Sequence, residues 1–396
     1  MACCRKAPAR PSAQSFEWEI VPQPDMDALT VVTCLDETAL DAARAELQSL
    51  CVALAECPPL RVRLVRHRLG DIVMLNVNHA AGDAFGAVRF LRSIARAYAG
   101  EADPRPDIDL TASRDLRSLL LARDVHTRLG RLLLLLQKTS DLVTVPARVA
   151  KHGGVDRPGY GIHQVRLSLE QTQALNSLGD GARVNNVLVA ALHVAIALWN
   201  IEHGVRCGRI SVLMPVNLRP AHLRAEMVGN FSLMVRVLTT PEQRSLGRVV
   251  LTVTDQVQRM KNGDTLAALI ELLARTASLP IWAKRVAPAV LAITGNRLVD
   301  TAQLANLGVV DELPSFGRDA GDTRELWYSP PARMPLGLSV GAVEAAGRLH
   351  LAFRYRHPLL SPDGACRLAD YYLSVLDQLV AWHTPKVRPE VSGPSL

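Results

Sequence analysis

The feature that most constrains the fold is a change of hydrophobic period within one short part of the chain. Residues 60–68 alternate apolar and basic side chains, and residues 71–78 form a second strand-like run after a turn at 69–71, which predicts a β-hairpin. In residues 84–100 the apolar side chains recur instead at helical spacing, and the run ends at Gly100. Two strands followed at once by a helix predict a layered structure that contains both element types.

The alternation of strands and helices continues along the chain. The further expected strands cover 162–169, 209–218, 230–239 and 304–310, with a hairpin of 335–342 and 348–355, and the expected helices cover 183–204, most of 243–298 and 362–382. This mixture predicts an α/β (α+β sandwich) fold rather than a doubly wound parallel sheet. The Gly/Pro-rich segment 152–161 predicts a domain boundary.

The length of 396 residues fits two domains of ordinary size, and 48% hydrophobic against 21% charged residues excludes a disordered chain. We expect an N-terminal subdomain at 16–155 and a C-terminal subdomain at 156–384. A leader at 1–15 and a tail at 385–396 are expected to be disordered.

Charge and cysteine content exclude several classes of protein. The net charge is +7, but the arginines are scattered and aromatic residues make up only 4% of the chain, so we expect no nucleic-acid partner. The seven cysteines are odd in number and form no C-x-x-C pair, which predicts neither a zinc site nor a disulfide framework. Since the sequence has neither a secretory signal nor an uninterrupted apolar run of spanning length, we expect a cytoplasmic protein.

One segment leaves contact with a membrane open. Leucines in residues 114–138 recur at helical spacing, with arginines on the opposite face. The simpler interpretation is a helix packed against the core. A basic amphipathic face is also typical of a helix at a lipid surface or against an acyl chain, which would make the protein peripheral to a membrane.

The strongest chemical motif is Asn78-His79-Ala80-Ala81-Gly82-Asp83, which joins the second strand to the first helix. His79 stands at the strand exit, where a neutral imidazole can act as a general base at cellular pH and can face a channel between domains. Asp83 fits either a helix N-cap or a buried carboxylate that pairs with an arginine. A purely structural histidine beside a capping aspartate is the alternative, and a metal site lacks a third ligand.

Residues 337–341 (Gly-Leu-Ser-Val-Gly) match the G-x-S-x-G pattern of serine hydrolases. A nucleophile elbow needs a strand, a sharp turn at the serine and then a helix. Here Ser339 lies within a predicted strand that continues into a hairpin, so we expect no hydrolase site.

Five segments in order carry a resemblance to a known family. They are 78–84 (NHAAGDA), 183–192 (RVNNVLVAAL), 214–220 (MPVNLRP), 228–232 (VGNFS) and 304–308 (LANLG). The first is similar to the H-H-x-x-x-D-G motif of the acyltransferase superfamily that includes chloramphenicol acetyltransferase and nonribosomal-peptide condensation domains. The others resemble its wax ester synthase/diacylglycerol acyltransferase and polyketide-associated acyltransferase (condensation protein) branch. The resemblance spans roughly residues 16–382.

This resemblance implies two chloramphenicol-acetyltransferase-like subdomains in a V with a central channel. His79 would be the general base that takes a proton from an acceptor hydroxyl or amine as the acceptor attacks an acyl thioester. Coenzyme A or a carrier-protein phosphopantetheine would be the leaving group, with no metal and no bound cofactor. We expect an O-acyltransferase of lipid or secondary metabolism that acts as a monomer.

The resemblance also implies roles for other residues. Asp83 would support the motif by pairing with an arginine that the sequence does not identify. Asn217 would be a donor to the developing oxyanion. The residues expected to line the channel are Asn78, Gly82, Asn217, Arg219 and Asn306.

Three departures from the family pattern keep a second function open. Asn78 replaces the first histidine, Ala84 replaces the glycine, and the strand and helix with which relatives begin are missing before residue 16. A lost strand would expose a sheet edge and could remove the arginine partner of Asp83. The alternative function is therefore a catalytically silent member that binds an acyl carrier or a lipid.

Overall fold

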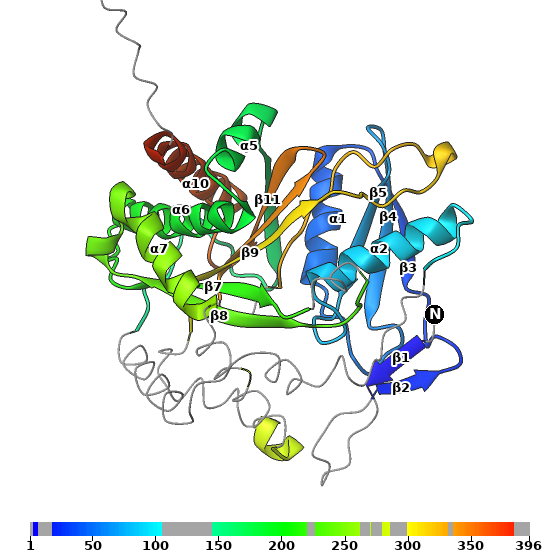
Figure 1. The fold of residues 1–396 in the computed structure, drawn as a ribbon. Coiled ribbons are helices and arrows are strands. Elements are labelled where there is room, and N and C mark those ends of the chain that lie inside the picture. The colour runs from blue at the N-terminus through cyan, green and yellow to red at the C-terminus, as the bar shows by residue number, and fades with distance from the viewer. Residues whose placement is uncertain are drawn as a thin grey trace, which may run out of the picture.

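The computed structural model contains two main β-sheets side by side, each with helices packed on one face (Figure 1). It describes residues 3–6, 18–104, 145–219, 226–261, 270, 279–285, 299–331 and 336–383. The amphipathic helix predicted at 114–138 and the tail at 385–396 lie outside these residues. So do most of the expected leader and most of the helical region expected after residue 261.

The N-terminal part is built around a three-stranded sheet in the order β3-β4-β5. Its elements are β3 (Leu29–Cys34), α1 (Glu37–Ser49), β4 (Leu60–His67), β5 (Ile72–Val77) and α2 (Ala84–Tyr98), preceded by the small ladder of β1 (Cys3–Lys6) and β2 (Trp18–Val21). β4 and β5 form the antiparallel hairpin predicted from the hydrophobic period, and β3 runs parallel to β4. α1 is the crossover that this parallel pairing needs.

β3 and α1 were not predicted from the sequence. α1 begins after Asp36, whose side chain accepts a hydrogen bond from the Ala39 N–H at 2.8 Å. The helix buries Leu40, Ala43 and Leu47, so about one apolar residue per turn holds it against the sheet. The other positions are mostly charged or small, which is why the hydrophobic pattern of this helix is weak.

The C-terminal part is built around a mixed six-stranded sheet in the order β6-β11-β10-β9-β7-β8. Its elements are β6 (Tyr160–Arg166), α5 (Leu169–Asn176), α6 (Gly181–Glu202), β7 (Ile210–Asn217), β8 (Ser232–Thr239), η3 (Pro241–Gln243), α7 (Leu246–Lys261), β9 (Ala302–Val310), η4 (Arg318–Ala320), β10 (Leu338–Ala345), β11 (Arg348–Arg356) and α10 (Pro362–His383). β9 is parallel to β10 and to β7, whereas the other pairs are antiparallel. The expected α/β fold without a doubly wound parallel sheet is confirmed.

One face of this six-stranded sheet is buried by α6 and α10 (Figure 1). Leu188, Leu192 and Ile196 of α6 are almost fully buried, and Tyr372 of α10 donates a hydrogen bond to the Leu188 carbonyl at 3.1 Å. Of the described helices, only α6 is long and apolar enough to cross a membrane, and 83% of its apolar window is buried inside the protein. That burial is typical of a core helix.

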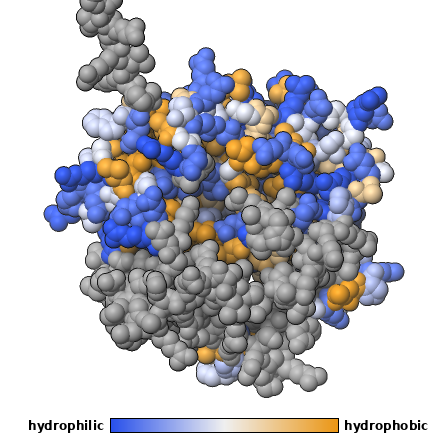
Figure 2. All heavy atoms as spheres, viewed as in Figure 1, coloured by the Kyte–Doolittle hydropathy of each residue, from blue (hydrophilic) through white to orange (hydrophobic). Residues whose placement is uncertain are grey.

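Hydrophobic side chains on the surface are distributed over several elements. On the described part of the face shown in Figure 2, they lie in groups between hydrophilic residues. Ile201, Leu251, Trp282 and Trp382 are exposed examples from four different segments. Peripheral contact with a membrane stays a prediction.

The opposite face of the six-stranded sheet turns toward the N-terminal part of the chain. The strand register places Ser339 of β10 beside Arg354 of β11 on this face. α1 reaches it, because Arg354 donates a hydrogen bond to the Gln48 carbonyl and the Tyr160 N–H of β6 donates to Ser49 Oγ at 2.9 Å. The C-terminal end of α1 therefore joins the two parts of the molecule.

The cysteines depart from expectation at one position. Cys57 is disulfide-bonded, so a disulfide is present where the sequence predicted no disulfide framework. The described cysteines that are free are Cys34, Cys51, Cys207 and Cys366. Disulfide pairing depends on how close two Cβ atoms lie in the folded chain, which an irregular spacing in sequence does not reveal.

The G-x-S-x-G match lies inside β10, as expected, and its second glycine has a packing role. A Cβ atom at Gly341 would clash with the Tyr328 carbonyl and would lie 2.8 Å from Cδ of Pro330. The segment 328–330 therefore crosses the sheet in direct contact with the Gly341 backbone, which only glycine permits.

Replacing Gly341 with alanine should lower the free energy of unfolding by about 1 to 3 kcal/mol, because the added methyl group must displace residues 328–330 from the sheet. Gly208→Ala is the matched control, since Gly208 is exposed and its Cβ position faces open space. Urea unfolding followed by circular dichroism measures both variants. Equal stability of the two variants would contradict this packing.

Candidate active site

A buried ion pair between Asp83 and Arg219 joins the two halves of the chain. Arg219 Nη1 lies 2.6 Å from Asp83 Oδ2, and Arg219 Nη2 lies 2.8 Å from Asp83 Oδ1, so the guanidinium binds both carboxylate oxygens. The side chain of Arg219 is 0% exposed and that of Asp83 is 2% exposed. Asp83 caps α2 and Arg219 follows β7, so the pair connects an element of each half.

The Asp83 carboxylate accepts three further hydrogen bonds. The Gly86 N–H donates to Oδ1 at 3.1 Å, the Phe231 N–H donates to Oδ2 at 2.9 Å, and Ser232 Oγ lies 3.1 Å from Oδ2. The two roles considered for Asp83 are therefore combined, because the residue caps α2 and also pairs with an arginine.

Arg219 in turn holds the loop that leads into β8. Its Nε donates to the Met227 carbonyl at 3.2 Å and its Nη2 donates to the Gly229 carbonyl at 2.8 Å. The Phe231 ring centroid lies 4.7 Å from the guanidinium carbon. The Asp83 N–H also donates to the Gly229 carbonyl, at 3.0 Å. The segment 228–232, singled out by the resemblance, is thus part of this site.

The electrostatics of the pair keep Asp83 ionised. Burial alone would raise the pKa of the Asp83 carboxyl. The hydrogen bonds and positive charge of Arg219, with the N–H groups of Phe231 and Gly86, outweigh burial and hold the pKa of Asp83 below its ordinary value of 3.8. An aspartate in this state is ionised and does not donate a proton at cellular pH.

Arg219 is the partner that the sequence left unassigned. The sequence analysis placed this residue among those lining a channel, whereas the structure buries its side chain against Asp83. Because Arg219 belongs to the segment 214–220, the pairing does not depend on any strand before residue 16.

His79 lies in the turn between β5 and α2 and is partly exposed. Its Nδ1 lies 3.3 Å from the Gly82 carbonyl oxygen. Because a carbonyl only accepts hydrogen bonds, this contact assigns the ring proton to Nδ1, and no described residue forms a hydrogen bond with Nε2. A tethered Nδ1–H with a free Nε2 is the tautomer that a general base requires.

The Asn78 side chain stabilises the same turn by two hydrogen bonds to backbone groups. Its Nδ2 donates to the Val52 carbonyl at 2.7 Å, and its Oδ1 accepts from the Ala80 N–H at 3.0 Å. Gly82 is buried, and a Cβ atom there would lie 3.5 Å from Cγ1 of Val77, an ordinary contact. Position 82 therefore does not require glycine, and its role in the site is the contact of its backbone carbonyl with His79.

Asn217 stands beside the ion pair at the end of β7. Its Oδ1 accepts from the backbone N–H of Arg219 at 3.0 Å and from Arg219 Nη1 at 3.3 Å. Its Nδ2 is buried and has no hydrogen-bond partner among the residues that the structure describes. A buried donor without a partner is costly, so Asn217 offers an unused N–H group next to the site.

Asn306 is not brought to this site by any interaction between described residues. It lies on β9 opposite Ala342, and its Oδ1 accepts from the Gly308 N–H at 2.9 Å. Gly308 has φ +75°, so this contact stabilises the left-handed turn of the strand.

Residues of the site that the sequence analysis missed are Gly86, Phe231, Ser232 and Tyr328. The first three touch Asp83 through a backbone N–H or a hydroxyl, and only the VGNFS segment signalled two of them. Burial and the nearby charge of Asp83 raise the pKa of the Tyr328 hydroxyl, which keeps it protonated. Among the described residues, no group of three or more His, Cys, Asp or Glu side chains could hold a metal ion.

Comparison with known proteins gives one clear relationship. The "Uncharacterized protein Rv2305" of Mycobacterium tuberculosis (strain ATCC 25618 / H37Rv) is 32% identical over 381 residues, which cover 95% of this chain and 87% of that protein. "Uncharacterized protein MT2362" of strain CDC 1551 / Oshkosh matches with the same identity and coverage. No protein-family model matches the sequence.

Solved structures with similar folds include a condensation domain and an epimerization domain. The first condensation domain of the calcium-dependent antibiotic synthetase has a TM-score of 0.63 at 14% identity, over 96% of this chain and 84% of that chain. The epimerization domain from the third module of tyrocidine synthetase B has a TM-score of 0.62 at 13% identity, over 96% and 84%. SgcC5 from Streptomyces globisporus has a TM-score of 0.61 at 18% identity, over 96% and 85%. These likenesses confirm the predicted fold of two chloramphenicol-acetyltransferase-like subdomains.

Replacing Asp83 with asparagine should lower the free energy of unfolding at neutral pH by about 3 to 5 kcal/mol, because it leaves the buried Arg219 cation unpaired. The pKa of Asp83 is depressed in the folded state, so its stabilisation is complete above 3.8 and is lost as the pH falls through the folded value. The difference between the native chain and the variant should therefore shrink below about pH 4. Urea titrations at several pH values measure it, with exposed Asp319→Asn as the control. A difference that is constant across this range would contradict the assignment.

Proposed function

Because the chain belongs to the family of the M. tuberculosis protein Rv2305 and has the condensation-domain fold, we propose that it is an acyltransferase. It moves an acyl group from a thioester to a hydroxyl or amine acceptor. The observation that carries this proposal is the turn 78–83, in which His79 Nε2 has no partner among the described residues while Asp83 is paired with Arg219.

In the proposed reaction His79 Nε2 takes the proton of the acceptor as the acceptor attacks the thioester carbonyl. The new C–O or C–N bond forms, and the C–S bond breaks when the tetrahedral intermediate collapses. The proton held by His79 then passes to the leaving thiolate. The thiol is coenzyme A or a carrier-protein phosphopantetheine, and the protein itself needs no metal for these steps.

Asn217 is proposed to stabilise the oxyanion of the tetrahedral intermediate. Its buried Nδ2 has no partner among the described residues, and its orientation is held by Oδ1 through two hydrogen bonds from Arg219. A donor fixed in this way loses little entropy when charge develops on the carbonyl oxygen.

The finer assignment follows the resemblance. We propose O-acyl transfer with a fatty or polyketide-like donor, as in the wax ester synthase and polyketide-associated branch. Because Asp83 and Arg219 both come from one chain, a monomer contains the complete motif. A carrier protein is a proposed donor as well as coenzyme A.

The two departures within the motif do not favour the catalytically silent alternative. The Asn78 side chain points back to the Val52 carbonyl, so the exchange of the first histidine leaves His79 in place. The Ala84 methyl group packs with the cluster around Leu307 and Val343. Both changes are thus accommodated by packing inside the turn and the helix.

Replacing His79 with alanine should lower acceptor-dependent thiol release by about 100-fold or more, since this is what a positioned general base contributes. The rate is measured with acyl-coenzyme A donors of short, medium and long chain and pooled alcohol and amine acceptors. His383→Ala, at the C-terminal end of α10, is the matched histidine control.

Equal rates in folded His79→Ala and native protein would remove His79 from the mechanism. If the folded native chain turns over neither coenzyme A nor carrier-protein thioesters, the acyl-carrier or lipid-binding alternative replaces the acyltransferase.

Asn217→Asp keeps an oxygen for Arg219 but removes the Nδ2 donor, so kcat should fall by about 100-fold while the KM for the thioester changes little. The thermal unfolding midpoint of the variant, measured in parallel, shows whether the substitution has also destabilised the Asp83–Arg219 ion pair. A fall in kcat that follows only a fall in stability would show a structural role for Asn217 instead.

A further inference from the structure

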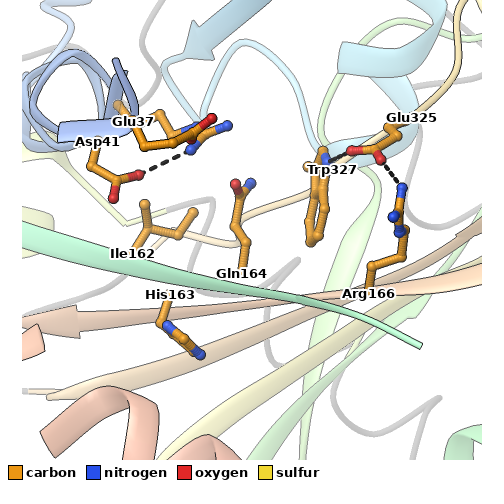
Figure 3. Close-up of a pocket in the computed structure, with 9 residues that line it drawn as sticks. Glu37, Asp41, Ile162, His163, Gln164, Arg166, Glu325 and Trp327 are labelled. Atoms are coloured by element: carbon orange, nitrogen blue, oxygen red, sulfur yellow. Dashed lines mark hydrogen bonds and ion pairs between the residues drawn. The ribbon is translucent and has the colours of Figure 1, made fainter. Parts of the chain in front are cut away.

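A cavity of about 370 Å³ lies between α1, β6 and the segment 325–327 (Figure 3). The residues used in the argument are Asp41 and Arg44 of α1, Gln164 and Arg166 of β6, and Glu325 and Trp327. Its volume is within the range of small-molecule sites. None of these residues touches the Asp83–Arg219 pair, so the cavity, here termed the α1–β6 pocket, is a separate site.

Four of the charged groups of the α1–β6 pocket are paired with each other, and Glu37, which also lines it, lies 3.8 Å from His67 Nε2 outside the pocket. Arg44 Nη1 lies 2.9 Å from Asp41 Oδ1, and Arg166 forms an ion pair with Glu325. An anionic or cationic ligand would have to compete with these pairs. Each guanidinium nevertheless keeps further N–H donors and each carboxylate keeps further lone pairs, so the walls offer donors and acceptors together. This combination suits hydroxyl groups, which donate and accept at once.

Trp327 supplies the one flat apolar wall. Its Nε1–H donates to Glu325 Oε2 at 2.9 Å, and its ring lies edge-on to His350 at 4.7 Å between centroids. His350 is only 2% exposed, so the indole is backed by the packed sheet and its orientation is fixed. In Figure 3 the indole stands beside Gln164 and faces the cavity.

Gln164 rises from the floor of the cavity between the two charged walls (Figure 3). Its amide forms no hydrogen bond to another described side chain or backbone group, and an amide can both donate and accept. The neighbouring His163 points to the other side of the strand, where its ring lies 6.5 Å from that of Phe353. The floor between the charged walls is therefore neutral, with the polar amide of Gln164 beside the apolar Ile162.

We propose that the α1–β6 pocket binds a carbohydrate ring. The ring would stack its apolar C–H face on Trp327, and its hydroxyls would bond to Gln164 and to the free positions of the two ion pairs. A single aromatic wall opposite a polar wall matches a sugar ring, which has an apolar face and a polar rim.

Resting on the proposed function, we assign this carbohydrate to the acyl acceptor. Asn76 Nδ2 donates to the Leu47 carbonyl at 2.7 Å, so the C-terminal end of α1 lies beside the strand that leads to His79. From Asp41 to Leu47 the helix rises by about 9 Å. A sugar held in the pocket can thus carry a second ring or a short chain, with its acceptor hydroxyl, toward His79.

Binding is tested without turnover, by saturation-transfer NMR and calorimetry with maltose and methyl α-glucoside on the full chain. The saccharides should bind, and Trp327→Ala and Gln164→Leu should each weaken binding by about tenfold. Trp282→Ala, an exposed tryptophan outside the pocket, should leave binding unchanged. 2-Phenylethylamine is the charged probe, and it should not compete.

The outcomes separate this proposal from the proposed function. Absence of saccharide binding to the folded native chain, binding that Trp327→Ala and Gln164→Leu leave intact, or preference for the amine would each overturn the carbohydrate site. Acyl transfer to a plain alcohol without saccharide binding would support the acyltransferase function and contradict the carbohydrate site. Saccharide binding to a chain without any acyl transfer would support the carbohydrate site and contradict the acyltransferase function. In an active enzyme, Gln164→Leu should raise the KM for a saccharide acceptor and leave the KM for the thioester unchanged.

Discussion

The ion pair of Asp83 and Arg219 is the interaction on which the rest of the site depends. Two fully buried charges are tolerated only because every oxygen of the carboxylate and most N–H groups of the guanidinium are hydrogen-bonded. The same carboxylate caps α2, so the helix start, the turn with His79 and the loop 227–231 are placed together. The position of His79 relative to the C-terminal half therefore follows from this pair.

A second junction lies along α1 and completes the geometry. Each contact there pairs a side chain with a backbone group, since Arg354 donates to the Gln48 carbonyl and the Tyr160 N–H donates to Ser49 Oγ. The ion pair at the start of α2 and the contacts at the end of α1 join the two halves at two places. The α1–β6 pocket forms where α1 and the segment 325–327 meet β6 at one edge of the six-stranded sheet.

The strands and helices with strong periodicity were predictable, and those held by few apolar residues were not. The hairpin of β4 and β5 and helix α2 follow from alternating and helical spacing. Helix α1 buries only Leu40, Ala43 and Leu47, which is too weak a hydrophobic pattern to predict a helix. His79 and Asp83 were found because they are close in sequence. Arg219 lies 136 residues from Asp83, and a sequence rich in arginine carries no local signal that selects one of them. The disulfide at Cys57 and the pocket at Trp327 likewise depend on contacts that only the folded chain creates.

The departures of the motif from its family pattern have a common physical explanation. In the turn 78–83, backbone groups and Asp83 make the contacts to His79 and α2, and Asn78 holds the turn without a titratable side chain. Asn78 bonds to a main-chain carbonyl and to a main-chain N–H, roles that need a polar side chain but no titratable one. The Gly82 carbonyl holds His79 Nδ1 whatever side chain residue 82 bears. A motif can therefore lose its first histidine and keep its base, provided that the carboxylate four residues later still finds its arginine.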